Sequence, residues 1–343
     1  MKLALNATKW GLNFGLWGPG AGPNIEAVKR AESLGYHSVW TAEAYGSDAV
    51  VPLTYLAAHT TRIKLGTAVL QIAARSPAMT AMTAATLDNL SGGRLLLGLG
   101  VSGPQVVEGW HNQPFDEPLV RLREYVEVVR MILRRQMPVE FHGRHYDLPY
   151  GGPGTTGEGK AMKLTLKPHR RDIPLYLGAM GPQNVRQTLE IADGWLPLFF
   201  PPNYPDALGV DLSTYPLKPG FEIAPFVPIV LGPDVDRCRS ALRPVLAFWI
   251  GGMGSRKRNF YTDLVARVGF EGLADRVRQE YLDGRLGDAA ALIPDELIDA
   301  LALVGPRGRI AERLESWHAS PITMMIIGGA TLEAIEVMAE LVL

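Results

Sequence analysis

The sequence contains a single cysteine, Cys238, among its 343 residues. One cysteine can form no disulfide within the chain, and no histidine or second cysteine stands beside Cys238 to indicate a metal ligand or a nucleophile. The sequence also lacks an apolar run long enough to cross a bilayer. Its N-terminal apolar run meets Asn6 and Lys9 before it reaches the length of a signal peptide. We therefore expect a cytoplasmic protein without a membrane partner.

The sequence also has no large excess of positive or of negative charge. The 34 lysines and arginines balance the 35 aspartates and glutamates to a net charge of -1. Such a chain has no global field that would attract nucleic acid, so no nucleic-acid partner is expected. No spacing of histidines, cysteines or carboxylates predicts a metal site, because His142 and His145 of the HGRH run lack further ligands.

Short aliphatic runs alternate with amphipathic stretches along the chain, which is typical of parallel βαβ units. The runs that we interpret as strands are Trp10 to Leu16, Tyr36 to Ala42, Ile63 to Val69, Leu95 to Leu99, Leu175 to Ala179, Trp195 to Phe200, Ile223 to Leu231 and Thr323 to Ile327. The turn after the first run lacks the G-x-G-x-x-G of a dinucleotide fold. An α/β fold is therefore predicted, as a closed (β/α)8 TIM barrel rather than an open sheet.

Helix signals separate these runs. Ser76 is placed as an N-cap before Pro77, and Gly92 closes the same helix, while a further amphipathic helix is predicted over 118–135. Two stretches are too long for simple crossovers. We interpret them as insertions in one domain spanning 1–343: about 137–172, with a hairpin turning at Gly143 over the barrel mouth, and about 232–320, helical throughout.

Two glycine-rich turns follow predicted strands. GLGVSGPQ ends at Gln105 and GAMGPQN places Gly181 and Pro182 at a helix start, so the backbone N–H groups of both turns could hold a phosphate, although each could be an ordinary tight turn. GTTGEGKA resembles a phosphate loop but has Ala161 where a Ser or Thr is required, which favours a substrate loop or lid. The RKR run at 256–258 is either a solvated face or a holder for an anionic group.

Some polar residues near predicted strand ends could carry chemistry. Glu43, Asp48 and Glu108 are carboxylates there, and two of them could act as acid and base in a barrel hydrolase. His111, beside Trp110, could move a proton near neutral pH. The alternative for each is a solvated or structural loop residue.

Three segments carry a resemblance to a known family. They are AESLGYHSVWTAEAYGSDAVVPL, TRIKLGTAVLQIAARSPAMTAMTAATLDNLSGGRLLLGLGVSGPQVVEGW and PLYLGAMGPQNVRQTLEIADGWLPLFF. With them the chain resembles the luciferase-like monooxygenase superfamily, and within it the branch that uses the deazaflavin coenzyme F420. The TLDxLSGGR run and the GLGxSG turn that follows it are specific to that superfamily.

The resemblance implies a cofactor at the C-terminal mouth of the barrel. It implies a cis peptide joining Ala68 and Val69, a phosphate held by backbone after the fourth and fifth strands, and a ring whose edge approaches the second strand. The cofactor-binding residues implied in this way are Ala42, Glu43, Ala68, Val69, Leu70, Gln71, Ser102, Gly103, Gly178, Ala179, Met180 and Gly181.

The chain departs from the sugar-phosphate dehydrogenases of that branch. Where those enzymes have an Asp-His pair and a catalytic Glu, this sequence has Ala42, Glu43 and Gly103, which argues against sugar-phosphate oxidation. We predict instead that Glu43 handles a proton, with Glu108 or His111 as an auxiliary. The apolar pocket walls are predicted to be Trp17, Trp110 and Phe200.

The predicted function is hydride transfer between coenzyme F420 and a small organic substrate. Three alternatives stay open at this point: an FMN-dependent monooxygenase of the same superfamily, a non-catalytic flavin-binding protein, and the barrel hydrolase. A homodimer is expected.

Overall fold

A ring of parallel strands forms the centre of the protein in the computed structural model, which describes residues 9–14, 24–253 and 260–343. The strands follow in the order β1 (Lys9–Asn13), β2 (Ser38–Thr41), β3 (Lys64–Thr67), β5 (Leu95–Gly100), β8 (Leu175–Gly178), β9 (Gly194–Leu196), β10 (Glu222–Ile223), β11 (Phe226–Leu231) and β13 (Met324–Gly328). Strand β10 pairs with β9, its continuation β11 pairs with β13, and β13 pairs with β1, so the ring closes. The barrel is confirmed, with a strand at each of the eight predicted runs, although Gly15 and Leu16 at the end of the first run lie outside the described residues.

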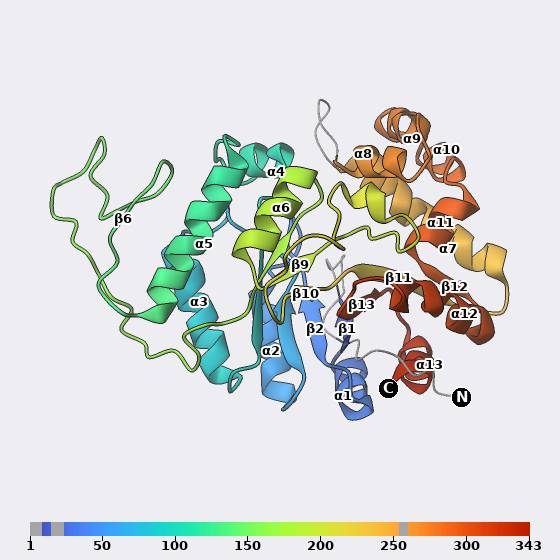
Figure 1. The fold of residues 1–343 in the computed structure, drawn as a ribbon, viewed down its shortest axis with the longest axis horizontal. Helices are drawn as coiled ribbons and strands as arrows, with labels where there is room; N and C mark the ends of the chain where they lie inside the picture. Colours follow the sequence, from blue (N-terminus) through green and yellow to red (C-terminus); the bar gives the residue numbers. More distant parts are fainter. Residues whose placement is uncertain (1–8, 15–23, 254–259) are drawn as a thin grey trace.

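Helices surround this ring (Figure 1). The helices that follow successive barrel strands are α1 (Ile25–Leu34), α2 (Val50–His59), α3 (Pro77–Leu90), α4 (Pro104–Gly109), α5 (Pro118–Arg134), α6 (Pro182–Ile191) and α13 (Leu332–Val342). Ser76 caps α3 through a hydrogen bond from the backbone N–H of Met79, and Gly35 ends α1 at φ 97°, a left-handed conformation that glycine adopts without strain. The predicted cap Ser76 is confirmed, and Gly92, predicted to close α3, follows the C-cap Ser91 with φ 66°.

The interior of the barrel is filled by side chains. Its cluster of buried residues is Trp40, Leu96, Tyr176, Leu196, Ala224, Met324 and Ile326. A Cβ on Gly66 would stand 2.1 Å from the ring of Trp40, so this position can only be glycine while the tryptophan stays in place. Ala68, Val69 and Phe226 pack on the cluster but are only partly buried, and they therefore form its end at the barrel mouth.

The first insertion contains the predicted hairpin, made by β6 (Phe141–His142) and β7 (Asp147–Leu148) in antiparallel pairing. Figure 1 shows it at the far left, outside α5 and away from the barrel strands. Its turn nevertheless reaches the mouth side of the barrel, because His145 and Tyr146 line a cavity together with Ile72 and Val101 from the loops after β4 (Leu70–Gln71) and β5. The predicted placement over the mouth therefore stays a prediction. Glu124 on α5 explains the position, because its carboxylate accepts hydrogen bonds from the backbone N–H groups of residues 144–146 and holds the hairpin against that helix.

The second insertion is mostly helical, with α7 (Val235–Ala247), the π-helical η2 (Phe248–Gly252), α8 (Phe260–Arg267), α9 (Leu273–Leu282), α10 (Leu286–Ala291), α11 (Asp295–Leu301) and α12 (Arg307–His318). It is not helical throughout, because β12 (Leu303–Gly305) runs parallel to β11. This segment buries a hydrophobic cluster of its own, which includes Leu246, Val277 and Leu297. The single domain expected over 1–343 stays a prediction.

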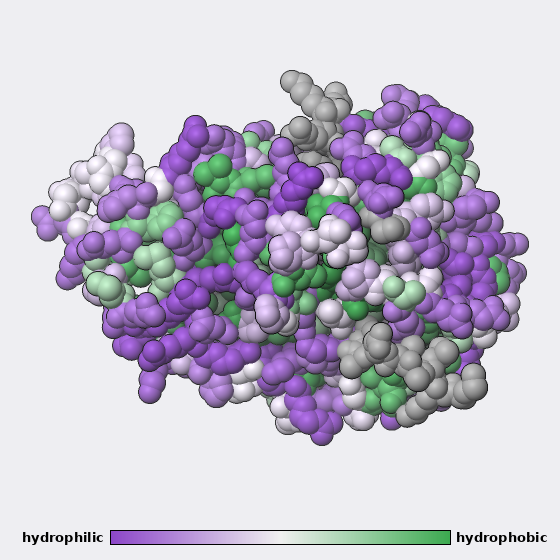
Figure 2. Space-filling view, in the orientation of Figure 1, coloured by the Kyte–Doolittle hydropathy of each residue, from purple (hydrophilic) through white to green (hydrophobic). Residues whose placement is uncertain are grey.

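The surface is largely polar. Figure 2 shows hydrophilic residues over most of one face, with hydrophobic residues gathered mainly in the middle of the view. Among the described residues, no helix combines the length and the apolar character that a membrane span requires. Trp17 and the RKR run at 256–258, both named from the sequence, lie outside the described residues.

Candidate cofactor site at the barrel mouth

The peptide bond between Ala68 and Val69 is cis, as the resemblance implied. It lies between β3 and the short strand β4 (Leu70–Gln71), which pairs with β5. A Cβ on Gly100 would meet Val69 Cγ2 at 2.5 Å, and one on Gly178 would meet Val69 Cγ1 at 3.1 Å. The glycines at the ends of β5 and β8 thus admit the Val69 side chain, which lies partly exposed above the barrel interior. We refer to Ala68, Val69 and Phe226 as the platform.

Glu43 lies beside the platform, in the loop after β2, with a side chain that is only 6% exposed. Its Oε1 accepts a hydrogen bond from the backbone N–H of Gln71 at 2.9 Å and another from Arg75, while Oε2 lies 3.4 Å from the backbone nitrogen of Ala49. Arg75 also pairs with Asp48. Both carboxylate oxygens of Glu43 are therefore engaged by groups of the protein itself.

The pKa of Arg75 depends on these carboxylates. Burial by itself would lower the pKa of Arg75, but the hydrogen bond that Arg75 donates to Glu43 and the charges of Glu43 and Asp48 hold that pKa above its ordinary value. The guanidinium thus stays protonated and joins the loop after β2 to the loop after β4. The sequence places Arg75 near a strand end but gives no sign of this pair.

Gln71 is the other polar residue at the platform, and it is 3% exposed. Its side-chain amide donates to the backbone oxygen of Ala44 at 2.8 Å, whereas its Oε1 is buried without a hydrogen-bond partner. Buried acceptors in native proteins are nearly always satisfied, so an unpaired one at this place fits a site that a ligand with an N–H or O–H group completes.

Two helices begin next to the platform. Gly103 precedes α4 and Gly181 precedes α6, each followed by a proline at the first helical position and neither with a side-chain cap. Their strands β5 and β8 are neighbours, pairing Leu99 with Leu177. The two turns thus present uncapped backbone N–H groups from adjacent strands, which suits the phosphate that the sequence placed there. Ser102 has φ 59°, a left-handed conformation at the start of the first turn.

The remaining predicted residues are spread over this region. Glu108 is exposed on α4, and Trp110 is 67% exposed at its end. His111 is half-buried, and its Nε2 has no hydrogen-bond partner. Phe200 is not a pocket wall, contrary to the prediction: it is 2% exposed and packs on Trp195 and Trp317, with ring centroids 6.1 and 6.3 Å away.

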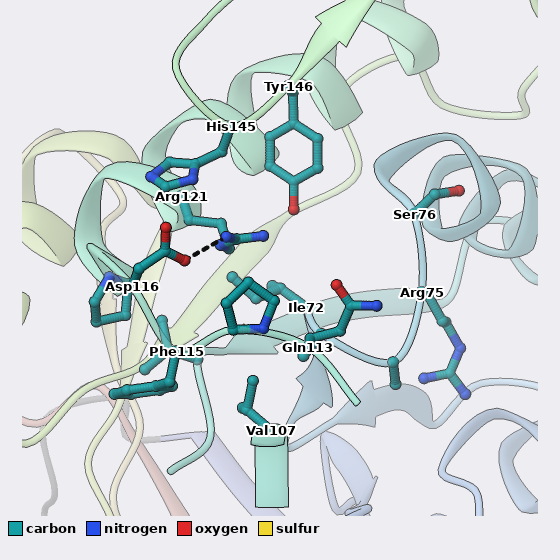
Figure 3. Close-up of a pocket in the computed structure, with 15 residues that line it drawn as sticks. Ile72, Arg75, Ser76, Val107, Gln113, Phe115, Asp116, Arg121, His145 and Tyr146 are labelled. Atoms are coloured by element: carbon teal, nitrogen blue, oxygen red, sulfur yellow. Dashed lines mark hydrogen bonds and ion pairs between the residues drawn. The ribbon is translucent and has the colours of Figure 1, made fainter. Parts of the chain in front are cut away.

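A cavity of about 420 Å³ lies beside the loops that follow β4 and β5 (Figure 3). It lies between the loop after β4, the loop from α4 to α5, and the turn of the hairpin. Polar side chains from each of these segments line it, among them Ser76, Gln113, Asp116, Arg121 and Tyr146. Sequence reasoning did not find this group, because its members are far apart in the chain and match no motif.

A closed parallel barrel with a cis-peptide platform and two glycine turns at its C-terminal mouth defines a cofactor-binding TIM barrel. The sequence matches the luciferase-like monooxygenase family over residues 13–324. The chain therefore belongs to that family, as its sequence suggested.

Several relatives agree over nearly the full length. Rv3520c of Mycobacterium tuberculosis, whose name assigns it provisionally as a coenzyme F420-dependent oxidoreductase, is 44% identical over 342 residues, covering 97% of this chain and 99% of that protein. The 5,10-methylenetetrahydromethanopterin reductase of Archaeoglobus fulgidus is 28% identical over 310 residues, covering 88% and 87%.

Solved structures show the same fold. The coenzyme F420-dependent tetrahydromethanopterin reductase of Methanopyrus kandleri superposes with a TM-score of 0.74 at 24% identity, covering 98% of this chain and 99% of that one. An F420-dependent secondary alcohol dehydrogenase, solved with an F420-acetone adduct, gives a TM-score of 0.76 at 18% identity, covering 100% and 98%.

Proposed function

We propose that this protein is a coenzyme F420-dependent oxidoreductase that transfers a hydride between the deazaflavin and a small organic substrate. The observation that carries the proposal is the platform, where Ala68, Val69 and Phe226 close the barrel interior and two uncapped helices begin beside it. The relative Rv3520c, named for F420 dependence, supports the choice of cofactor.

The residues present fit such a cofactor. Ala68, Val69, Leu70 and Gln71 would lie behind the ring, with Ala42 and Glu43 near its edge, and the unpaired Oε1 of Gln71 would accept a hydrogen bond there. The phosphate would lie at the backbone of Ser102 and Gly103 and of the run Gly178, Ala179, Met180 and Gly181. When bound, F420 supplies the site that gives or takes the hydride.

The protein's own residues position the bound cofactor and exclude water from it. Val69 fixes the depth at which a planar ring can rest, because its methyl groups already fill the space above Gly100 and Gly178. Glu43 holds the backbone N–H of Gln71 and the side chain of Arg75, so we assign it a positioning role. The prediction that Glu43 also moves a proton, aided by Glu108 or His111, remains to be tested.

The alternatives can be separated. An FMN-dependent monooxygenase would use the same platform, and cofactor preference distinguishes it. A non-catalytic carrier would bind the cofactor but would not reduce or oxidise it with any substrate. The hydrolase loses support, because Glu43 is paired with Arg75 and Glu108 is exposed on α4.

We also propose a homodimer formed through α2 and α3. A groove of about 260 Å³ lies between these helices, and its lining consists of Val50, Leu87 and Leu90 with two methionines and three threonines. Met82, at its edge, is 50% exposed, and Leu90 is 69% exposed. Neighbouring exposed apolar groups of this kind favour burial against another protein surface. The single cysteine, Cys238, is buried and free, which is compatible with the cytoplasmic location we propose.

The proposed cofactor is tested with cofactor-free protein incubated separately with F420 and with FMN, then freed of unbound cofactor on a desalting column. We expect the absorbance spectrum of the protein fraction to show retained F420. Retention of FMN alone would assign the protein to the monooxygenase alternative.

A further inference from the structure

The cavity beside the platform has no part in the proposed hydride transfer. Its inner wall contains Ile72 and Val101, which directly adjoin Gln71 and Ser102, two of the residues proposed to hold the cofactor. The backbone N–H of Ile72 donates to the oxygen of Gly100 at 3.1 Å, so this wall is fixed to β5. A group in the cavity would therefore belong to a molecule that also occupies the barrel mouth, or to one bound next to it.

The hairpin side of the cavity is held in place by one carboxylate. Glu124 accepts hydrogen bonds from the backbone nitrogens of Arg144, His145 and Tyr146 at 2.7, 2.8 and 3.1 Å. Through these bonds α5 fixes the two side chains that the hairpin contributes to the cavity, His145 and Tyr146. Figure 3 shows the Tyr146 hydroxyl pointing into the cavity toward Arg121.

The loop between α4 and α5 forms another wall and is held in an unusual backbone conformation. Asn112 has φ 53° and Glu117 has φ 40°, left-handed values that are uncommon for residues other than glycine. Such conformations persist where the surrounding structure enforces them, often next to ligand sites. The cavity is thus enclosed by segments that are each fixed before a ligand arrives.

The polar groups in the cavity are mainly donors. Arg121, 19% exposed, donates from Nη2 to Asp116 at 2.6 Å and also makes a side-chain hydrogen bond to Tyr146, while its Nε is buried without a hydrogen-bond partner. The side chain of His145 is 6% exposed, and its Nε2 makes no hydrogen bond although Glu117 Oε2 lies 3.5 Å away. Burial raises the pKa of Tyr146, which keeps its hydroxyl protonated and able to donate.

Arg121 is the cation that a ligand in the cavity would meet. The other arginine of the lining, Arg75, is neutralised by Glu43 and Asp48, and Figure 3 shows its side chain directed away from the cavity. Asp116 is 57% exposed and takes up only one N–H of Arg121. One guanidinium that is partly neutralised matches a ligand with a single negative charge better than a doubly charged phosphate.

We propose that this cavity is a carboxylate-binding subsite, in which Arg121, His145 and Tyr146 hold a carboxylate belonging to a ligand at the barrel mouth. The inference rests on the proposed function for the identity of that ligand. Two sources share the chemistry: the glutamate tail of coenzyme F420 and an organic acid that serves as substrate. A carboxylate bound in the cavity would attach the ligand to α5 and to the hairpin, in addition to its contacts at the platform.

The first experiment probes the cavity without the cofactor. Glutarate is added to the cofactor-free protein, and its effect on the melting temperature is compared among the wild type, Arg121→Met and Arg123→Met. Arg123 is a matched control on the same helix, paired at the surface with Glu190. We expect glutarate to raise the melting temperature of the wild type and of Arg123→Met, with the rise lost in Arg121→Met. If glutarate raises the melting temperature equally in all three proteins, or does not raise that of the wild type, the proposal is overturned.

Tyr146→Phe serves as a second variant in case Arg121→Met does not fold. It removes one hydroxyl and keeps the ring that packs on Tyr125. We expect the concentration of glutarate needed for half of the thermal shift to rise about threefold or more, since a hydrogen bond to a charged group is lost. An unchanged concentration in this folded variant also contradicts the subsite.

The second experiment distinguishes the two sources. F420 with its glutamate tail and F420 without glutamates are titrated into the wild type and Arg121→Met by fluorescence. If the tail occupies the cavity, the variant binds tailed F420 about fivefold more weakly and binds the untailed form equally. If a substrate occupies it, both forms bind the variant as they bind the wild type, and glutarate still stabilises the F420-loaded wild type. A wild type that responds to glutarate but binds no F420 refutes the proposed function and leaves the subsite standing.

Discussion

The carboxylate of Glu43 receives the guanidinium of Arg75 at the barrel mouth, and the pair joins the loop after β2 to the loop after β4. The same carboxylate accepts the backbone N–H of Gln71, which follows the cis peptide by two residues. The position of the platform therefore depends on a residue that the sequence suggested for proton transfer. The structure gives that residue a positioning role that can be tested.

Replacing Glu43 with Gln should destabilise the protein. Arg75 would lose the charge of its more buried partner, and we expect the free energy of unfolding to fall by about 1–3 kcal/mol. Denaturant unfolding and turnover are measured on the same preparation. Glu108→Gln is the stability control, because Glu108 is exposed. A normal unfolding free energy together with a turnover reduced by about 10²-fold to 10⁴-fold would contradict the positioning role and support proton transfer by Glu43.

Replacing Gly181 with Leu should weaken cofactor binding without unfolding the protein. Gly181 has φ -78° and ψ 145°, which any residue adopts, so the change adds only a side chain at the start of α6. That side chain would occupy the space proposed for the phosphate, and we expect the Kd for F420 to rise about tenfold or more. Gly308→Leu is the control, since a Cβ there meets no atom within 4 Å. Equal affinity in the two folded variants would disprove the placement of the phosphate.

Stability should decline as the pH falls from about 6.5 to about 4. Burial, helped by the charge of Lys9, lowers the pKa of His37 to about 4. Between this value and the unfolded pKa of about 6.5, the unfolded chain binds a proton that the folded chain does not. The unfolding free energy therefore rises with pH across the window, by roughly 3 kcal/mol at most, and this contribution is lost on acidification.

The check is the urea midpoint measured from pH 4 to pH 7 in the wild type, His37→Asn and His169→Asn. His169 is exposed and should leave the pH dependence unchanged. His37→Asn should flatten it. If the urea midpoint of His37→Asn depended on pH as steeply as that of the wild type, the acid sensitivity would come from other groups.

Met82→Glu should dissociate the proposed dimer. The substitution places a charge in the apolar groove between α2 and α3, where burial against a second copy would leave it without a partner. Light scattering during gel filtration measures the mass. Met137→Glu is the matched control, because Met137 is 73% exposed and lies outside the groove. A wild type that is monomeric at all concentrations would rule the dimer out.

The barrel could be predicted because its strands and caps are local patterns. Runs such as Leu95 to Leu99 read as buried parallel strands, and Ser76 with Pro77 marks a helix start within a few residues. The short strand β12 was missed, since its three residues LVG lie between helices and resemble a turn. Its pairing with β11, far back in the chain, is what makes it a strand.

Long-range side-chain contacts account for the other differences. Glu43 and Arg75 are 32 residues apart and belong to no motif, so their pairing required the barrel geometry. Phe200 was expected at the mouth because it ends a predicted strand, yet its ring packs on Trp317 of α12. The hairpin packs against α5 because Glu124 of that helix binds its turn. None of these contacts is visible in the spacing of residues.

The most direct test of this account is an equilibrium titration of the cofactor-free protein with F420 and with FMN, each followed by fluorescence under the same conditions. The account predicts that F420 binds at least about tenfold more tightly than FMN. Tighter binding of FMN would contradict it.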